Sequence, residues 1–439
     1  MKQSANKAMG LILTLVVPVF SVFSRPQTVP AGGAGNTVIR FQENEEIPEK
    51  IRLETFTLVW ETIRDKYYDP TFGGRDWNAL GAKYRPLAAG MKLSGEFHAL
   101  LGKMLAALGR SHLSLFAPHQ RSASGNPAAV PRMAPPGIKL CAGEGRIFIA
   151  SVAEDSPAWA AGLRAGFVLT KAGDSPFPAE ADIHQSAMRA LIAAQRGLAG
   201  PEGTSVDVTL LDENDREKMV SLARTVPFRD RANLAKSIFE HRRVHPRVGY
   251  MRFDGWAFDL KPKLEAALKD LWDSDGLIFD CRQNRGGVNP GVDYLASVLF
   301  AEPGLIAVET PRQGERREWK HGGSGAGAYQ GGVAVLIDDG SGSASEVFAG
   351  WLQETGRAVI LGNRSFGGVL SSTQVPLPTD GVLQFPHSDM RTAKGKSIEG
   401  AGVVPDIPVE MTRADLLRGK DTVVERAIRE ILRRSAPQD

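Results

Sequence analysis

The chain has 439 residues, of which 42% are hydrophobic and 23% are charged, and this composition is typical of globular proteins. The length is large for one domain and sufficient for two or three. The formal net charge is only +3 and no basic block alternates with aromatic residues, which argues against a nucleic acid as the main partner.

The N-terminal segment has the pattern of an export signal. Lys2 and Lys7 precede a short apolar run over residues 9–23, and a loose tract rich in proline, glycine and alanine follows. A basic start, a short apolar stretch and a small-residue tail are typical of a secretory signal. The run is short for a membrane span. We therefore predict a signal peptide and leader over residues 1–37 and an exported protein, periplasmic or secreted. An uncleaved anchor and a disordered leader are the alternatives.

A small helical domain is predicted over residues 46–118. In FTLVWETIRDKYY, residues 56–68, apolar side chains recur every three or four positions, which is typical of an amphipathic helix. Two further helical runs follow, with Asp76 and Ser94 as candidate N-caps. Residues 119–136 are a linker by composition, because they are rich in proline, serine and alanine.

A compact β-rich unit is predicted over residues 137–227. Its short strands surround SPAWAAGLRAGF, residues 156–167, which resembles the helix–turn–strand passage of bacterial PDZ domains. Phe167 stands where that family usually has an aspartate. The resemblance implies that backbone amides in one loop bind a peptide's C-terminal carboxylate. The residues of that loop are Gly137, Ile138, Lys139 and Leu140. The alternative is a spacer that binds nothing.

The two cysteines, Cys141 and Cys281, lie far apart in apolar, strand-like runs. They form neither a metal-binding pattern nor a disulfide framework. We interpret both as small buried hydrophobic side chains. An export signal would permit a disulfide between them without implying one. No metal, nucleotide or cofactor motif stands out, so we expect no cofactor and no metal site.

Strands alternate with helices over residues 228–439. The strands are VGYMRF, GLIFDCR, VAVLID and RAVILGN, and amphipathic runs separate them. This alternation predicts a mostly parallel sheet covered by helices, that is, an α/β core.

The stretch DDGSGSASEVF, residues 338–348, joins one of these strands to a helix. A nucleophilic serine must be held still, with backbone N–H groups nearby for an oxyanion, and a strand-to-helix turn supplies both. Ser343 is the candidate nucleophile, and Ala344 provides the candidate N–H group. The alternative is that these serines only cap the helix.

A second stretch, LIFDCRQNRGGV, places a glycine pair directly after a buried strand. In α/β sheets, functional sites lie at the C-terminal ends of the strands. Gly286 or Gly287 is therefore the candidate for the second oxyanion N–H group.

Taken together, the two stretches resemble the peptidase family that joins tricorn protease to the carboxyl-terminal processing (tail-specific) proteases. Motifs of that family read I-L-D-L-R-N-N-P-G-G and G-S-A-S-A-S-E-I, and the resemblance covers residues from about 50 to 415. It implies a ClpP/crotonase-like αβ core with an inserted PDZ-like domain and an N-terminal helical domain. It also implies a serine endopeptidase that cleaves exported or unfolded polypeptides through an acyl-enzyme, with Ser343 as the nucleophile.

One residue departs from the processing branch of that family. There a lysine in F-G-K-G is the general base, whereas this chain has Phe366-Gly367-Gly368-Val369, so that Gly368 occupies the lysine position. The tricorn branch uses a histidine instead.

Resemblance to the tricorn branch implies His112 as the base and Ser111 and Glu399 as the residues that hold its ring. Lys394 and Lys396 lie near Glu399 in the sequence, and we interpret them as solvated loop charges.

A non-catalytic protein that binds peptides or small apolar ligands on the same fold is the alternative, because interphotoreceptor retinoid-binding protein resembles this family's core. The presence of nucleophile, base and orienting residues favours the enzyme. The expected partner is a protein or peptide substrate, with no nucleic acid and no membrane beyond a possible N-terminal anchor. The sequence does not indicate the oligomeric state.

Overall fold

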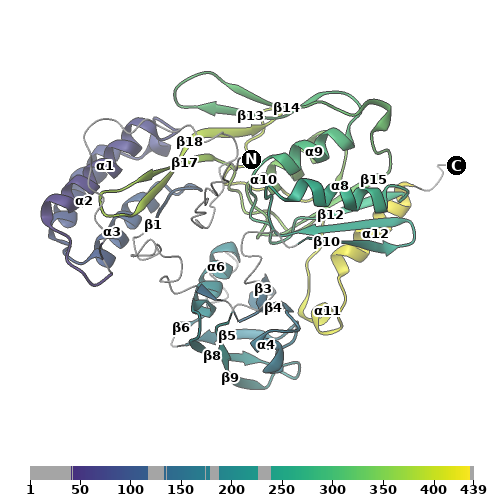
Figure 1. Ribbon diagram of the computed structural model, residues 1–439, viewed down its shortest axis with the longest axis horizontal. Coiled ribbons are helices and arrows are strands. Elements are labelled where there is room, and N and C mark those ends of the chain that lie inside the picture. The colour runs from purple at the N-terminus through teal and green to yellow at the C-terminus, as the bar shows by residue number, and fades with distance from the viewer. Residues whose placement is uncertain are drawn as a thin grey trace, which may run out of the picture.

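The computed structural model describes residues 41, 43–116, 133–134, 136–173, 175–177, 187–225 and 239–435. The predicted leader, most of the predicted linker and the first residues of the predicted core lie outside these ranges. No helix in the described part of the chain is long and apolar enough to cross a membrane. Figure 1 shows three parts, with a helical part at the left, an α/β core at the right and a β-rich unit below.

The helical part consists of α1 (Glu49–Lys66), α2 (Trp77–Gly90) and α3 (Ser94–Ala106). Their buried apolar faces form one cluster with side chains of the core's outlying sheet, such as Leu383 and Phe385. Asp76 caps α2 as predicted, since its carboxylate accepts a hydrogen bond from Ala79 N at 2.9 Å. The prediction for Ser94 was wrong. Leu93 is the N-cap of α3, and Ser94 is buried inside the first turn.

The centre of the core is a six-stranded sheet in the order β10-β11-β12-β15-β16-β19. The strands are β10 (Phe239–His245), β11 (Val248–Phe253), β12 (Gly276–Asp280), β15 (Gly332–Ile337), β16 (Val359–Gly362) and β19 (Ile407–Pro408). All neighbours pair in parallel except β10, which runs antiparallel to β11. The predicted mostly parallel sheet is therefore confirmed.

Helices cover both faces of this sheet, because successive side chains of a strand point to opposite sides. Leu277 and Phe279 of β12 pack against α8 (Leu260–Leu271), α9 (Pro290–Leu299) and α10 (Ala344–Glu354). Ile278, between them in the sequence, packs on the other face with α12 (Thr422–Arg434). Burial on both faces explains why GLIFD reads as a continuous apolar run.

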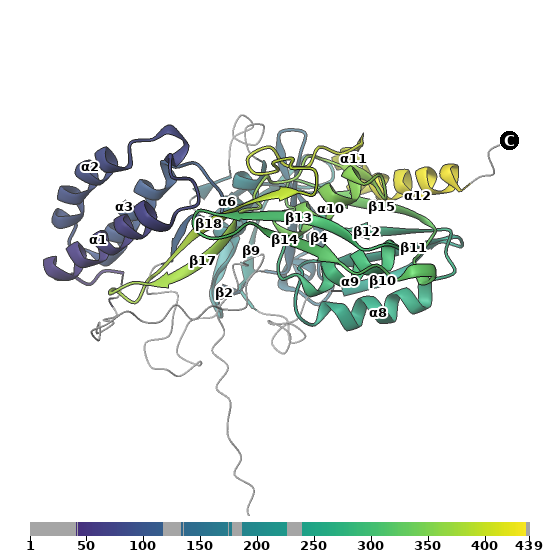
Figure 2. The ribbon, with the colours of Figure 1, turned by 90° about the horizontal axis from the view of Figure 1, so that it is seen from above.

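A second sheet, which the sequence analysis did not predict, is antiparallel and connects the core to the helical part (Figure 2). Its strands are β1 (Ser114–Phe116), β13 (Gly304–Pro311), β14 (Arg317–His321), β17 (Ser371–Pro376) and β18 (Val382–Thr392). Ser114 of β1 pairs with Gln384 of β18. This pairing attaches the end of the helical part, immediately after His112, to the core.

The β-rich unit has its own buried core and a sheet in the order β3-β4-β5-β8-β9. The strands are β3 (Ile138–Gly143), β4 (Arg146–Val152), β5 (Val168–Ala172), β8 (Ser205–Leu211) and β9 (Glu217–Ala223). Two short helices, α4 (Pro157–Ala160) and α6 (Ala187–Leu198), belong to it. The arginine of α11 (Arg413–Leu417) ties the unit to the core through an ion pair with Asp215 at 2.6 Å. Cys141 on β3 and Cys281 after β12 are both free thiols.

Candidate active site

Ser343 lies at the turn between β15 and α10, with a strained backbone. Its φ of 53° and ψ of −119° are rare for a residue with a side chain, and such strain clusters at functional sites. The residue is only 2% exposed, and its Oγ forms no hydrogen bond within the described part of the chain. A buried hydroxyl without a partner is costly in a folded protein, which makes Ser343 Oγ a candidate reacting atom.

Glu346, in the first turn of α10, holds the Ser343 turn in place. Its fully buried carboxylate accepts hydrogen bonds from Ser343 N at 3.0 Å, Gly367 N at 2.5 Å, Gly368 N at 2.8 Å and Ser365 Oγ at 2.5 Å. Burial raises the pKa of Glu346 to about 7 in spite of these donors. The sequence analysis missed this role, because an acid three residues into a helix is also an ordinary N-terminal feature.

The glycine pair after β12 packs directly against the Ser343 turn. A methyl group on Gly286 would lie 2.5 Å from Ser343 Cβ, so only glycine fits. Gly286 N already donates to Asn284 Oδ1 at 2.9 Å. Of the two alternatives for the second oxyanion N–H group, Gly286 and Gly287, this leaves Gly287. Gly287 N and Ala344 N donate no hydrogen bond to any of the described residues. The candidate oxyanion pair therefore narrows to these two N–H groups.

The candidate base follows α3 and precedes β1. His112 Nδ1 lies 2.8 Å from Ser111 Oγ, and Ser111 Oγ donates to Glu399 Oε2 at 2.9 Å. Glu399 also accepts Ser111 N at 2.9 Å and Val369 N at 3.0 Å. Because the single Ser111 hydroxyl proton goes to Glu399, the hydroxyl oxygen accepts from Nδ1–H. This assignment leaves Nε2 of the ring with a free lone pair, as a general base requires.

The pKa shifts of His112 and Glu399 are consistent with His112 as a general base. Burial lowers the pKa of His112 to about 4, although part of the residue remains exposed, so the ring is neutral near pH 7. Burial raises the pKa of Glu399, and the hydrogen bonds from Ser111 and Val369 and the charge of Arg110 oppose that shift. His112 also has a positive φ of 55°, which is uncommon for a residue with a side chain.

The segment around Gly368 connects the nucleophile to the base. Gly368 O accepts Ser343 N at 3.0 Å, and a methyl group on Gly368 would lie 3.0 Å from Ser111 Cβ. The same methyl group would lie 2.6 Å from the ring of Phe366. A lysine at this position therefore does not fit the observed conformation. The structure brings Ser343, Ser111, His112 and Glu399 to one place, although no hydrogen bond joins His112 to Ser343.

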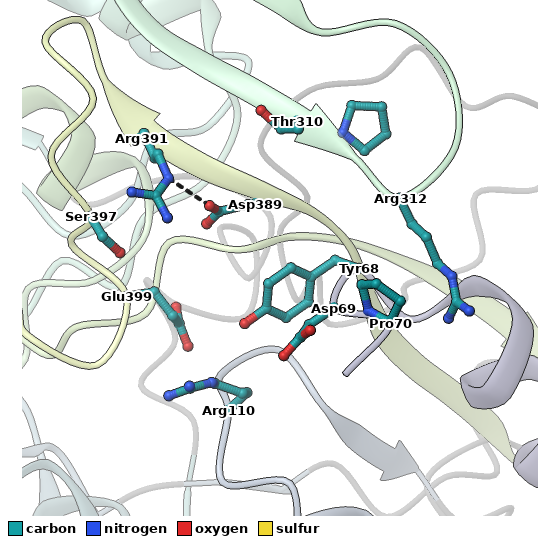
Figure 3. A pocket seen from close by; sticks show the side chains of 11 residues that line it. Tyr68, Asp69, Pro70, Arg110, Thr310, Arg312, Asp389, Arg391, Ser397 and Glu399 are labelled. Atoms are coloured by element: carbon teal, nitrogen blue, oxygen red, sulfur yellow. Dashed lines mark hydrogen bonds and ion pairs between the residues drawn. The ribbon is translucent and has the colours of Figure 1, made fainter. Parts of the chain in front are cut away.

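A pocket of about 480 Å³ opens beside Glu399, on the boundary between the helical part and the antiparallel sheet (Figure 3). Arg110, the residue before Ser111, lines it together with Tyr68 and Asp69. Lys394 takes no part in the site, since its Nζ is directed to Glu354 O at 2.9 Å.

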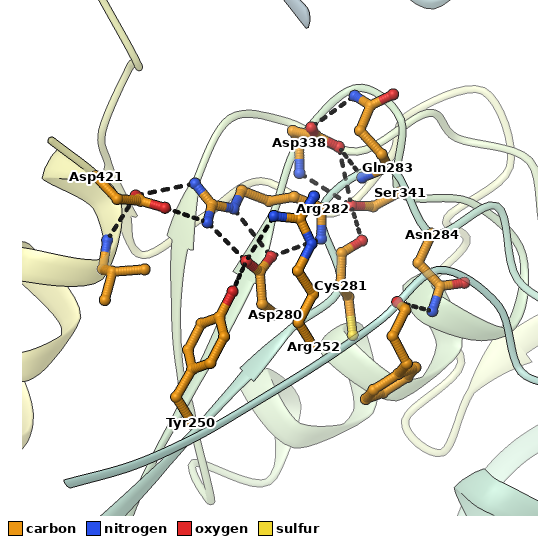
Figure 4. A network of polar contacts seen from close by, with 12 residues as sticks. Tyr250, Arg252, Asp280, Cys281, Arg282, Gln283, Asn284, Asp338, Ser341 and Asp421 are labelled. Carbon is orange, nitrogen blue, oxygen red and sulfur yellow. Dashed lines mark hydrogen bonds and ion pairs between the residues drawn. The ribbon is translucent and has the colours of Figure 1, made fainter. Parts of the chain in front are cut away.

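A polar network anchors the start of the glycine loop (Figure 4). Arg282 Nη2 lies 2.6 Å from both Asp280 Oδ2 and Asp421 Oδ2, and Tyr250 donates to Asp280 at 2.7 Å. Burial raises the pKa of Asp280, but Arg282 outweighs that effect and holds the pKa at about 2. The network fixes the chain that leads to Gly286. In the described ranges, no cluster of histidine, cysteine or acidic residues could hold a metal ion.

An α/β fold with a strained serine at a strand-to-helix turn, free N–H groups beside it and a neighbouring Ser-His-Glu cluster has the features of a serine hydrolase. Two family models match the chain, peptidase family S41 over residues 247–409 and the tricorn protease C1 domain over residues 48–106. These two segments are thus similar to peptidase family S41 and to the tricorn C1 domain, which confirms the relationship predicted from the motifs.

Individual proteins similar to this chain are named as carboxyl-terminal-processing proteases. A carboxy-terminal-processing protease of Bartonella bacilliformis is 28% identical over 297 residues, which cover 66% of this chain and 64% of that protein. A carboxyl-terminal-processing protease of Synechocystis sp. is 25% identical over 394 residues, covering 86% and 84% respectively. The solved structure of photosystem II D1 C-terminal processing protease shares the fold, with a TM-score of 0.57 and 23% identity over 82% of this chain and 93% of that one.

Proposed function

We propose that this protein is a serine endopeptidase that cleaves polypeptides through an acyl-enzyme, with Ser343, His112, Ser111 and Glu399 as a catalytic tetrad. The observation that carries the proposal is the unpartnered, buried Oγ of Ser343 in a strained turn at a helix N-terminus.

In the proposed reaction, His112 Nε2 takes the proton of Ser343 Oγ as the oxygen attacks the scissile carbonyl. Gly287 N and Ala344 N then donate to the carbonyl oxygen as it becomes negative. Ser111 and Glu399 stabilise the imidazolium, which next gives its proton to the leaving amine. Water attacks the ester in the second half, with His112 again as the base.

The β-rich unit is proposed to act as a PDZ-like domain that binds peptide tails. β3 is an edge strand of its sheet and α6 packs against it, so a peptide can add beside β3 as a further strand. Ile138, Lys139 and Leu140 belong to this strand, and only Gly137, with a φ of 86°, lies in the turn before it. Export of the protein, indicated by the N-terminal segment, belongs to the same proposal.

The test is labelling of the intact protein with a fluorophosphonate probe, followed by localisation of the adduct by mass spectrometry. We expect an adduct on Ser343, none in Ser343→Ala, and labelling slower by several orders of magnitude in His112→Ala. Ser324→Ala, at an exposed serine outside the proposed tetrad, is the control and should label normally. A protein that neither labels nor cleaves denatured polypeptides would instead be the non-catalytic binding protein.

A further inference from the structure

Phe366 is an exposed aromatic residue inside an otherwise buried segment. Its relative exposure is 42%, whereas Ser365 and residues 367–370 are buried. A single exposed apolar side chain is ordinary on a protein surface. The position of this one is unusual, because the segment that carries it also carries Gly368, the hydrogen-bond partner of Ser343.

The ring of Phe366 lies across the nucleophile turn. Phe366 N donates to Ser341 O at 2.9 Å, which fixes the start of the side chain beside the turn. A methyl group placed on Gly342 would lie 3.7 Å from the ring. On the other side, a methyl group on Gly368 would lie 2.6 Å from it. The ring therefore borders both Gly342, which precedes Ser343, and Gly368, whose carbonyl accepts Ser343 N.

The missing side chain at position 368 makes room for the ring. Gly368 is not among the glycines with positive φ, so its backbone does not require glycine. What glycine provides here is space, since any Cβ would displace the ring of Phe366. The observed position of the Phe366 ring therefore depends on the absence of a side chain at Gly368.

We propose that Phe366 forms an apolar subsite that receives an aliphatic or aromatic side chain adjoining the scissile bond. This inference rests on the proposed peptidase function. The scissile carbonyl must reach Ser343 Oγ, and consecutive Cα atoms are only about 3.8 Å apart, so a side chain next to the bond comes close to the ring. Contact with the ring removes apolar surface of both partners from water, whereas a charged side chain would lose hydration there without gaining an ion pair.

The experiment uses internally quenched peptides that share one sequence and differ only in the residue before or after the cleaved bond, which is Leu, Phe, Ala, Asp or Lys. Mass spectrometry fixes the bond that is cut. For one of the two positions, we expect kcat/KM to be about 10-fold or more higher with Leu or Phe than with Asp. Phe366→Ala should remove most of this preference, and Phe366→Leu should restore part of it.

A control variant separates the loss of the ring from general damage. Leu87→Ala, at a residue with a similar exposure of 45% on α2, should leave the preference unchanged. Equal kcat/KM for all peptides, or a preference that survives in Phe366→Ala, overturns the subsite while leaving the peptidase intact. Absence of any cleavage together with absence of fluorophosphonate labelling overturns both.

Discussion

At the scale of single residues, the site depends on one neutral imidazole. The ring of His112 is largely removed from water and lies beside Ser111 rather than directly beside a carboxylate. A nearby carboxylate would favour the charged ring, but Glu399 acts through the intervening hydroxyl. Burial therefore dominates and keeps the ring neutral. A neutral ring is ready to accept a proton at physiological pH.

We predict that kcat/KM rises with pH through an ionisation of His112 near 4, with any further change near pH 7 reporting on Glu346. The sign follows from the lowered pKa, because protonation below about pH 4 occupies the lone pair that Ser343 needs as its base. An unperturbed imidazole has a pKa near 6.5, and burial of the His112 ring accounts for the lower value. The measurement is a kcat/KM profile over the range in which the fold stays intact by circular dichroism. A rate that climbs only at alkaline pH, and that Lys394→Ala or Lys396→Ala abolishes, would identify a lysine base instead.

At the scale of elements, the site is assembled by contacts between segments that are distant in the sequence. Glu346 joins α10 to the segment 365–368, and Glu399 joins the loop after β18 to the end of the helical part. Among the described residues, no cation contacts either carboxylate directly. Both are held mainly by backbone N–H groups, so the geometry of the segments is fixed together with that of the acids.

Replacement of Glu346 by alanine should lower the free energy of unfolding by about 3 kcal/mol or more, because buried N–H groups left without an acceptor cost roughly 1–3 kcal/mol each. Those groups are Gly367 N and Gly368 N, whereas Ser343 N keeps Gly368 O as an acceptor. Glu346→Gln keeps one acceptor oxygen and should be milder. Urea unfolding followed by tryptophan fluorescence measures both. A loss below about 1 kcal/mol for the alanine variant would mean that water replaces the carboxylate.

The sequence identified individual residues of the candidate site better than the contacts that bring them together. Ser343, Gly287 and His112 belong to short local patterns, and the sheet that carries Ser343 follows from alternating strands and helices. The pairing of β1 with β18 was not predicted, because short strands with mixed burial give no clear periodicity. The engagement of Gly286 N by Asn284 and the fourfold role of Glu346 depend on side-chain directions after folding. Local patterns do not encode such directions.

At the scale of the whole molecule, the β-rich unit touches the core close to the site. Gln195 on α6 accepts a hydrogen bond from Arg285 Nη2 at 2.6 Å, and Arg285 directly precedes Gly286. Elsewhere, Glu144 N donates to Glu410 at 3.1 Å and Arg413 pairs with Asp215. The helix that borders the proposed peptide groove is thus in direct contact with the loop that carries a proposed oxyanion donor.

A substrate with a free C-terminal carboxylate should therefore be captured better than the same peptide with an amidated end. Capture at β3 tethers the chain and makes its next encounter with Ser343 intramolecular, although the tail itself binds only weakly, at roughly micromolar Kd. Amidation removes the charge that backbone amides near Gly137 would bind, so KM should rise about 10-fold or more, which corresponds to the loss of one charge-assisted hydrogen bond. The value of kcat should stay nearly constant, since the chemistry at the cut bond is unchanged.

Steady-state kinetics on the paired peptides measures both constants, and titration calorimetry with Ser343→Ala measures binding without cleavage. Equal KM and equal binding for the two ends would leave the β-rich unit as a spacer, with its contact to Arg285 serving only to hold it in place.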